Sequence, residues 1–177
     1  MDGRGMNARW LMGGTVMLAL ALGGLLYWSQ VYAGFEVTEG GEMTLVSYAS
    51  GAAEPIEVAN LKTLDRINSP VAYRACFDMP LSIPALTETY VAYEDPVPLI
   101  APGWFDCFDA KAVGAALEAG EAFAFLSAEN VVYGIDRVVA VMPDGRGVAW
   151  HQINRCGEVV FDGQPAPEGC PPVPERD

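Results

Sequence analysis

The feature that most constrains this chain is an uncharged stretch near its amino end, from Trp10 to Phe35. Its apolar centre, Leu11 to Tyr27, is rich in Leu, Met, Ala and Gly, and a bilayer span needs roughly 20 such residues. Aromatic side chains flank this centre, as is typical of the two boundaries of a membrane: Trp10 before it, and Tyr27, Trp28 and Tyr32 at its far end. The stretch therefore predicts a transmembrane helix over residues 10–33.

The charges around this stretch predict its orientation. Arg4 and Arg9 precede it, whereas Glu36, Glu39 and Glu42 follow it. Because basic residues stay on the cytoplasmic side, we expect residues 1–9 in the cytoplasm. The apolar run is longer than the roughly 7–15 residues of a signal-peptide core, so we expect the helix to be retained as a signal anchor. A cleaved signal peptide is the alternative, since "VYA", ending at Ala33, has the small residues that signal peptidase accepts. Both interpretations export the rest of the chain.

Small side chains recur every four residues within the predicted helix, at Thr15, Ala19 and Gly23. Such a stripe lets a second membrane helix approach closely, so these three residues are candidates for a helix contact. The alternative is chance, because the whole span is rich in Gly and Ala.

Export gives a meaning to the four cysteines, because thiols outside the cytoplasm are normally oxidised to disulfides. Of the three possible pairings we expect the one between sequence neighbours, Cys76 with Cys107 and Cys156 with Cys170. No C-x-x-C motif is present, and His151 is the only histidine, so a zinc site would need reduced cysteines alone. We therefore predict no metal and no cofactor.

The stretch "APGWFDCFD" around Cys107 resembles a reactive centre, and its aromatic residues suggest a buried disulfide instead. We expect Trp104, Phe105 and Phe108 to shield the bridge to Cys76. Asp109 is then the cap of a helix from Asp109 to Ala119, which Gly120 ends. A catalytic interpretation would need Cys107 as a free thiolate close to His151.

Beyond the anchor, runs of strands around one clear helix predict an α+β domain over residues 34–163 with a mainly antiparallel sheet. A hairpin is expected at Asp144-Gly145, and a Pro-rich tail, residues 164–177, is pinned by Cys170. Residues 59–69 are expected as a short helix or loop, and residues 79–103 as mostly irregular with at most one helical turn. The expected strands are 71–77, 121–127, 135–142, 147–153 and 158–161, with two short extended runs within 34–48.

The charge of the chain argues against nucleic acid as a partner. The net charge is -13, and 8 basic and 22 acidic residues lie beyond Trp10. Nucleic acid should therefore be repelled. A small-ligand or hydrolytic site is an alternative function, and its candidate residues are Arg74, Glu88, Asp136, Arg137 and His151. Because His151 lies in an alternating strand, a packing role is expected for it rather than that of a base.

Several specific strings resemble an uncharacterised family of single-span envelope proteins, with a domain of unknown function, from Rhodobacter-related alphaproteobacteria. The strings are "RACF", "TETY", "APGWFDCFDA", "YGIDRVVAV", "WHQIN" and "CGEVVFDGQPAPEGCP". The resemblance implies a bacterial inner membrane, with the domain in the periplasm, and supplies no activity or site residue. Some members are labelled histidine kinase, which does not fit a chain with no room for an ATP-binding domain.

We therefore expect a non-enzymatic module, anchored in inner-membrane lipid, that binds another envelope protein or complex. The anchor would raise its local concentration near such a partner. Aromatic residues of the kind enriched at protein interfaces, Tyr90, Tyr93 and Trp104, support this interpretation.

Overall fold

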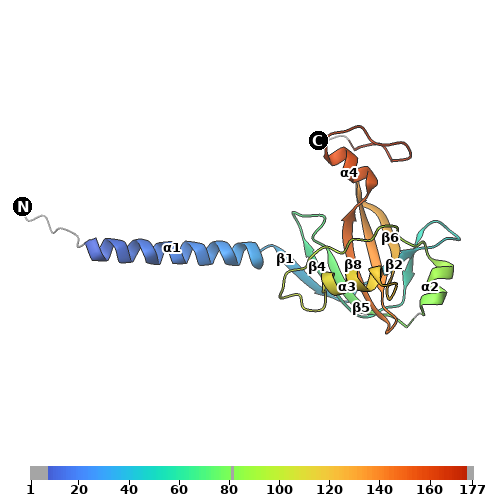
Figure 1. Cartoon of the computed structure of the whole chain (residues 1–177), viewed down its shortest axis with the longest axis horizontal. Helices are drawn as coiled ribbons and strands as arrows, with labels where there is room; N and C mark the ends of the chain where they lie inside the picture. Colours follow the sequence, from blue (N-terminus) through green and yellow to red (C-terminus); the bar gives the residue numbers. More distant parts are fainter. Residues whose placement is uncertain (1–7, 81, 175–177) are drawn as a thin grey trace, which may run out of the picture. The chain divides into compact units, whose positions relative to one another are not determined.

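A computed structural model describes residues 8–80 and 82–174 of the chain (Figure 1). Most of the predicted cytoplasmic segment, residues 1–7 with Arg4, lies outside the described residues, as do Leu81 and residues 175–177. The elements are α1 (Ala8–Val31), β1 (Phe35–Glu39), β2 (Met43–Val46), β3 (Ala53–Ile56), β4 (Ala59–Arg66), β5 (Arg74–Asp78), α2 (Ile83–Thr89), α3 (Ala110–Glu118), β6 (Phe123–Val132), β7 (Ile135–Val141), β8 (Arg146–Ile153) and α4 (Arg155–Phe161).

The chain divides into two units, one ending at Phe35 and the other starting at Glu36. In the first unit, residues Trp10–Val31 of α1 form a 22-residue apolar segment with a mean hydropathy of 1.7. By length and composition this helix is able to cross a membrane, and a signal sequence at this position would pass the same test. Thr15, Ala19 and Gly23 are exposed on it, and the Thr15 hydroxyl donates to Leu11 O of its own helix at 2.9 Å.

The second unit is built on a six-stranded sheet in the order β1-β4-β5-β8-β7-β6, with a separate two-stranded sheet of β2 and β3. The β4–β5, β5–β8, β8–β7 and β7–β6 pairs are antiparallel. The predicted hairpin is confirmed at Asp144-Gly145, where Gly145 has φ +86° and joins β7 to β8. The α+β class with a mainly antiparallel sheet is therefore confirmed.

The main hydrophobic core lies on one face of the large sheet. Side chains directly opposite in an antiparallel pair share a face, so Ala75 of β5, Ala149 of β8 and Val139 of β7 form one row. The small β2–β3 sheet and α2 supply Met43, Leu45 and Leu86 to the same cluster. All six side chains are fully buried.

The opposite face of the sheet carries a second layer of buried side chains. Trp150 and Arg74 are paired across β8 and β5 and share this face, with Phe108 edge-to-face against Trp150 at 6.4 Å between ring centres. Phe108 and Phe105 belong to the irregular segment before α3, and both are buried. The aromatic run around Cys107 therefore fills this layer and brings α3 to this side of the sheet (Figure 1).

Three local expectations are wrong. Residues 59–66 form strand β4, not a short helix or loop, and residues 158–161 belong to helix α4, not to a strand. The segment around Pro84 forms the seven-residue helix α2, which is longer than one turn. Instead of one clear helix, the domain thus has α2, α3 and α4 among its described residues.

Candidate functional site

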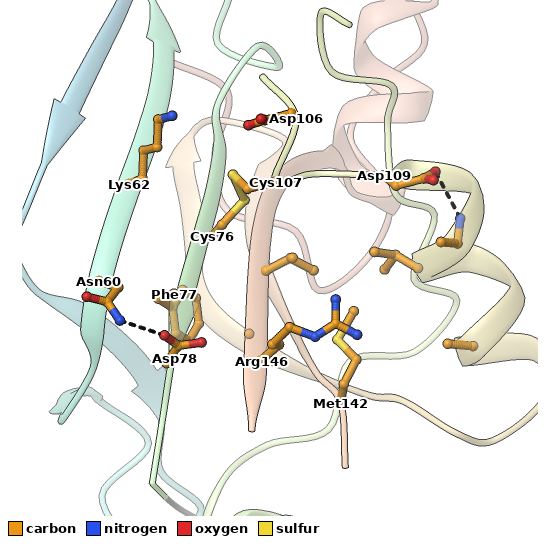
Figure 2. A pocket seen from close by; sticks show the side chains of 15 residues that line it. Asn60, Lys62, Cys76, Phe77, Asp78, Asp106, Cys107, Asp109, Met142 and Arg146 are labelled. Atoms are coloured by element: carbon orange, nitrogen blue, oxygen red, sulfur yellow. Dashed lines mark hydrogen bonds between the residues drawn. A yellow bond between two sulfur atoms is a disulfide. The ribbon is translucent and has the colours of Figure 1, made fainter. Parts of the chain in front are cut away.

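A cavity of about 470 Å³ lies on the α3 side of the sheet, and we call it the α3 pocket. Buried Val113 of α3 and Val148 of β8 contribute apolar surface. Polar side chains come from β4, β5, β8 and the loop before α3 (Figure 2). They are Asn60, Lys62, Asp78, Asp106, Asp109 and Arg146. The pocket thus combines apolar surface from α3 and β8 with charged side chains of both signs, which come from the strands and from the loop before α3.

Hydrogen bonds inside the domain hold most of these polar groups. Asn60 donates to Asp78 Oδ2 at 2.7 Å, from a left-handed backbone (φ 53°) at an irregularity in the β4–β5 pairing. Arg146 donates to Asp144 at 2.7 Å, and this hydrogen bond lowers the pKa of the Asp144 carboxyl. Asp109 caps α3 by accepting from two backbone N–H groups. The positions of these groups are therefore set before anything enters the pocket.

The first disulfide, Cys76–Cys107, lines this pocket and confirms the predicted pairing. Figure 2 shows the bridge between Lys62 of β4 and the start of α3 at Asp109. Cys107 is exposed and Cys76 is half-buried. The expectation that aromatic rings shield this bridge is therefore wrong at Cys107, because Phe105 and Phe108 are buried in the layer against the sheet while Cys107 itself is exposed.

The second disulfide, Cys156–Cys170, also confirms the predicted pairing. Cys156 lies in α4 and is only 8% exposed. The tail around Cys170 has further attachments, since Arg155 donates to Glu168 O at 3.0 Å and Tyr133 donates to Pro171 O at 3.2 Å. The tail is thus pinned by Cys170, as predicted, and by these hydrogen bonds.

Arg74 is buried, with 4% exposure, and is occupied by backbone carbonyls. Its guanidinium donates to Leu99 O at 2.8 Å and Ile100 O at 3.1 Å, and also to Val71 O and Tyr73 O. Burial lowers the pKa of Arg74 to about 10, so the side chain stays charged at neutral pH. Arg74 therefore attaches the irregular segment before α3 to the sheet, and its donors are used in doing so.

His151 is held at both ring nitrogens on the core face. Its Nε2 accepts from Arg137 Nε at 3.1 Å, so Nδ1 carries the proton and donates to Pro70 O at 2.6 Å. Tyr73 stacks on the imidazole at 4.5 Å, and the Arg137 guanidinium lies 4.5 Å over the Tyr73 ring. Burial and the Arg137 charge lower the pKa of His151 to about 4. The ring is therefore neutral at physiological pH, and its lone pair is occupied.

Asp136 anchors a second, acidic pocket at the other end of the sheet. It accepts from Asn130 N at 2.9 Å, Asn154 Nδ2 at 2.8 Å and Tyr93 Oη at 3.3 Å. Burial, and then the Asp136 charge, raise the pKa of Tyr93, which keeps its hydroxyl protonated as a donor. Other carboxylates line this pocket: Glu94, Asp95, Glu129 and Glu158. Among the described residues, no group of three or more His, Cys, Asp or Glu side chains is placed to hold a metal ion.

The five residues of the alternative ligand site do not share one face of the sheet. Pairing register and alternation put Arg74 and Asp136 on the α3 side, whereas Arg137 and His151 point into the core side. Glu88 is exposed on α2. Arg137 and His151 are in contact, as described above, and each of the other three has a separate environment.

A family model covers most of this architecture. Residues 43–171 match DUF6446, described as a family of unknown function. The chain belongs to the DUF6446 family. No curated protein and no solved structure matches the chain.

The DUF6446 match starts at the first residue of β2 and ends one residue after Cys170. It therefore contains the α3 pocket and both disulfides, and it does not include α1 or β1. The disulfides are typical of a domain in an oxidising, extracytoplasmic compartment. A domain of unknown function with two disulfides is thus joined to a helix that is able to cross a membrane.

The β4 side of the α3 pocket, with Asn60 and Lys62, was not predicted from the sequence, because no strand was expected there. The sequence feature that could have indicated this strand is the pair of leucines Leu61 and Leu64. They are three residues apart and both buried, on opposite faces of β4, so the strand lacks the simple alternation of a half-buried strand. The cap of α4 was also missed, although Asn154 before "RCGE" is a helix-start pattern: its Oδ1 accepts from the N–H groups of Cys156 and Gly157.

Proposed function

We propose that this DUF6446 protein is a non-enzymatic module, anchored in the inner membrane, whose periplasmic domain binds another envelope protein or complex. The N-terminus is in the cytoplasm and the domain outside it, as the placement of Arg4 and Arg9 before the helix favours. The anchor keeps the domain close to membrane partners and so raises its effective concentration there.

The observation that carries the proposal is that His151 and Arg74 already serve the fold and that the structure holds neither Cys76 nor Cys107 as a free thiolate. The lone pair of His151 accepts from Arg137, and the guanidinium of Arg74 is used by four backbone carbonyls. Cys76 and Cys107 are joined to each other. A general base or a nucleophile needs a free lone pair or thiolate, so these groups are better suited to structure than to catalysis.

The α3 pocket is the surface we assign to the partner. Interfaces combine a buried apolar centre with a polar rim, and this pocket has Val113 and Val148 next to Lys62, Asp106 and Arg146. Because the rim carries both signs of charge, it favours a polypeptide with its own mixed charges over nucleic acid, which the acidic domain repels.

The test places a photo-crosslinking amino acid at Ala112, which is exposed on α3 and lines the pocket. The full-length protein is expressed in its native host, irradiated in intact cells and analysed by mass spectrometry. We expect a discrete adduct with one envelope protein. Ala115, exposed on the same helix outside the pocket lining, is the matched control and should give no such adduct.

Two results would contradict the proposal. One is recovery of the Ala112 variant without any adduct, as a monodisperse monomer. The other is the same pattern of adducts from Ala112 and Ala115, which would mean that the pocket has no selective partner.

A further inference from the structure

The two disulfides of the domain differ in their access to solvent, and this difference has a chemical consequence. Cys107 is exposed and Cys76 is half-buried, whereas in the other bridge Cys156 is only 8% exposed and Cys170 is half-buried. Each bridge contributes to the lining of a cavity, so the exposure of Cys107 is what distinguishes the first bridge. A disulfide is reduced by attack of a thiolate on one of its sulfurs, so access decides which bridge reacts first. We propose that Cys76–Cys107 is a thiol–disulfide exchange site, and that its partner is a dithiol reductant that enters the α3 pocket.

The segment that carries Cys107 is held in place without the bridge. Phe105 and Phe108, on either side of it, are buried, and Phe108 packs against Trp150. Asp109 caps α3 immediately afterwards. Because these contacts remain when the sulfurs separate, the bridge can open and close again with the loop still in register. A disulfide that was the only attachment of a loose segment would not keep that segment in register when it opened.

The surroundings of the bridge give its two sulfurs different roles. Lys62 is directly opposite Cys76 in the β4–β5 register, so both side chains share one face of the sheet. The Lys62 ammonium lies 5.5 Å over the ring of Phe105, which keeps it at the side of the pocket where the bridge is. A nearby ammonium group stabilises a thiolate, and a more stable thiolate is a better leaving group. Attack is therefore expected at exposed Cys107, with Cys76 as the sulfur that leaves.

The exchange takes place in two steps. A thiolate of the reductant attacks Cys107 Sγ; a new sulfur–sulfur bond forms there while the Cys107–Cys76 bond breaks, and the electron pair goes to Cys76 as a thiolate beside Lys62. The second thiolate of the reductant then attacks the reductant sulfur of this mixed disulfide and releases Cys107 as a thiolate. The protein gains two electrons and, after protonation by water, two protons. The dithiol is oxidised to a disulfide.

The experiment treats the folded full-length protein, in detergent, with dithiothreitol for increasing times. Free thiols are then alkylated and located by mass spectrometry, while circular dichroism follows the fold. We expect Cys76 and Cys107 to be labelled about tenfold faster than Cys156 and Cys170, with the fold intact. Opening of both bridges together, or of Cys156–Cys170 first, would overturn the proposal.

Two further measurements test the assigned roles. With glutathione, a monothiol, the mixed disulfide should map to Cys107 and not to Cys76; the reverse result contradicts the assigned direction of attack. Lys62→Met should slow reduction of this bridge, whereas Lys111→Met, which removes the only other lysine of the chain, should not. Equal rates in both variants would overturn the role of Lys62. The inference rests on the proposed function for its compartment and uses the same α3 pocket, but the rates of reduction do not depend on an envelope partner, so a missing Ala112 adduct would leave these results standing.

Discussion

His151 shows how a single buried side chain makes the stability of this domain depend on pH. The ring is 7% exposed, and the pKa of His151 in the folded state is about 4, against an ordinary value of 6.5. As the pH falls below 6.5, the unfolded chain takes up a proton at this ring and the folded chain does not. The folded state is therefore favoured fully only above pH 6.5.

We expect the free energy of unfolding to fall by about 2 kcal/mol between pH 7 and pH 5 because of His151. Below about pH 4 the ring would be protonated in both states, and the loss from this group would stop growing. Urea titrations at several pH values measure the effect. His151→Gln removes the titrating ring and should flatten the slope over this range, so an unchanged slope would contradict the assignment.

Gly147 is a second residue whose identity the fold requires. It is directly opposite Phe77 in the β5–β8 register, and a Cβ at this position would overlap the Phe77 ring. The ring is only 3% exposed, and buried side chains tolerate little added volume.

We therefore expect Gly147→Ala to destabilise the domain by about 1–3 kcal/mol, which is the range for an overpacked core. Gly103→Ala is the matched control, because a Cβ there meets nothing within 4 Å. Thermal unfolding of both variants measures the difference. Equal melting temperatures would show that the ring accommodates the methyl group.

At the scale of elements, α3 depends on its first hydrogen bonds. Asp109 Oδ1 accepts from Lys111 N at 3.0 Å and Ala112 N at 3.1 Å, which satisfies two donors that the helix cannot. The helix is only nine residues long, so it has little stability of its own.

Asp109→Ala should lower the free energy of unfolding by about 1 kcal/mol, which is typical for loss of an N-cap. Asp109→Ser keeps an oxygen acceptor at the cap and should restore most of this loss. Chemical unfolding of the two variants makes the comparison. If Ser were as destabilising as Ala, the role of the side chain would be other than capping.

The elements that the sequence predicts well are those with a local signal. The Asp109 cap and Gly120 predict both ends of α3, and Asp144-Gly145 predicts the β7–β8 hairpin. Strand β4 lacks such a signal, because its two buried side chains, Leu61 and Leu64, lie on opposite faces and give no simple alternation. In α4 the apolar run "EVVF" favours a strand. The segment is nevertheless helical, because Asn154 caps its first turn and Gly157 packs closely against Gly134.

The candidate site was predictable only in part for the same reason. The cysteine pairing follows from sequence order, because each bridge joins neighbours in the chain. The α3 pocket does not, since Lys62 and Arg146 meet Cys107 only through the strand order β4-β5-β8. The opposite faces of Arg74 and Arg137 follow from register, which no local pattern gives.

At the scale of the whole molecule, the proposed topology makes a direct prediction. Alkaline phosphatase, which needs an oxidising compartment, should be active when fused behind Asp177, because the C-terminus is then periplasmic. Green fluorescent protein at the same position should be dark if exported unfolded. Fluorescence together with an inactive phosphatase would place the domain in the cytoplasm and remove the basis for both disulfides.

The charge of the whole chain gives a further expectation. With a net charge of -13, the protein should not be retained on heparin or DNA columns at low salt. Elution in the flow-through, followed by absorbance and gel analysis, is the expected result. Tight retention that weakens with salt would show a basic surface and would contradict the exclusion of nucleic acid as a partner.

The boundary between helix and sheet has one more consequence. Helix α1 ends at Val31, and the first strand starts at Phe35, so no strand of the sheet includes residues 32–34. One proteolytic event within these three residues would shed the domain with all its strands, both bridges and the whole DUF6446 region intact. A cell with such a protease would contain two forms of the same folded domain, one anchored in the membrane and one released from it.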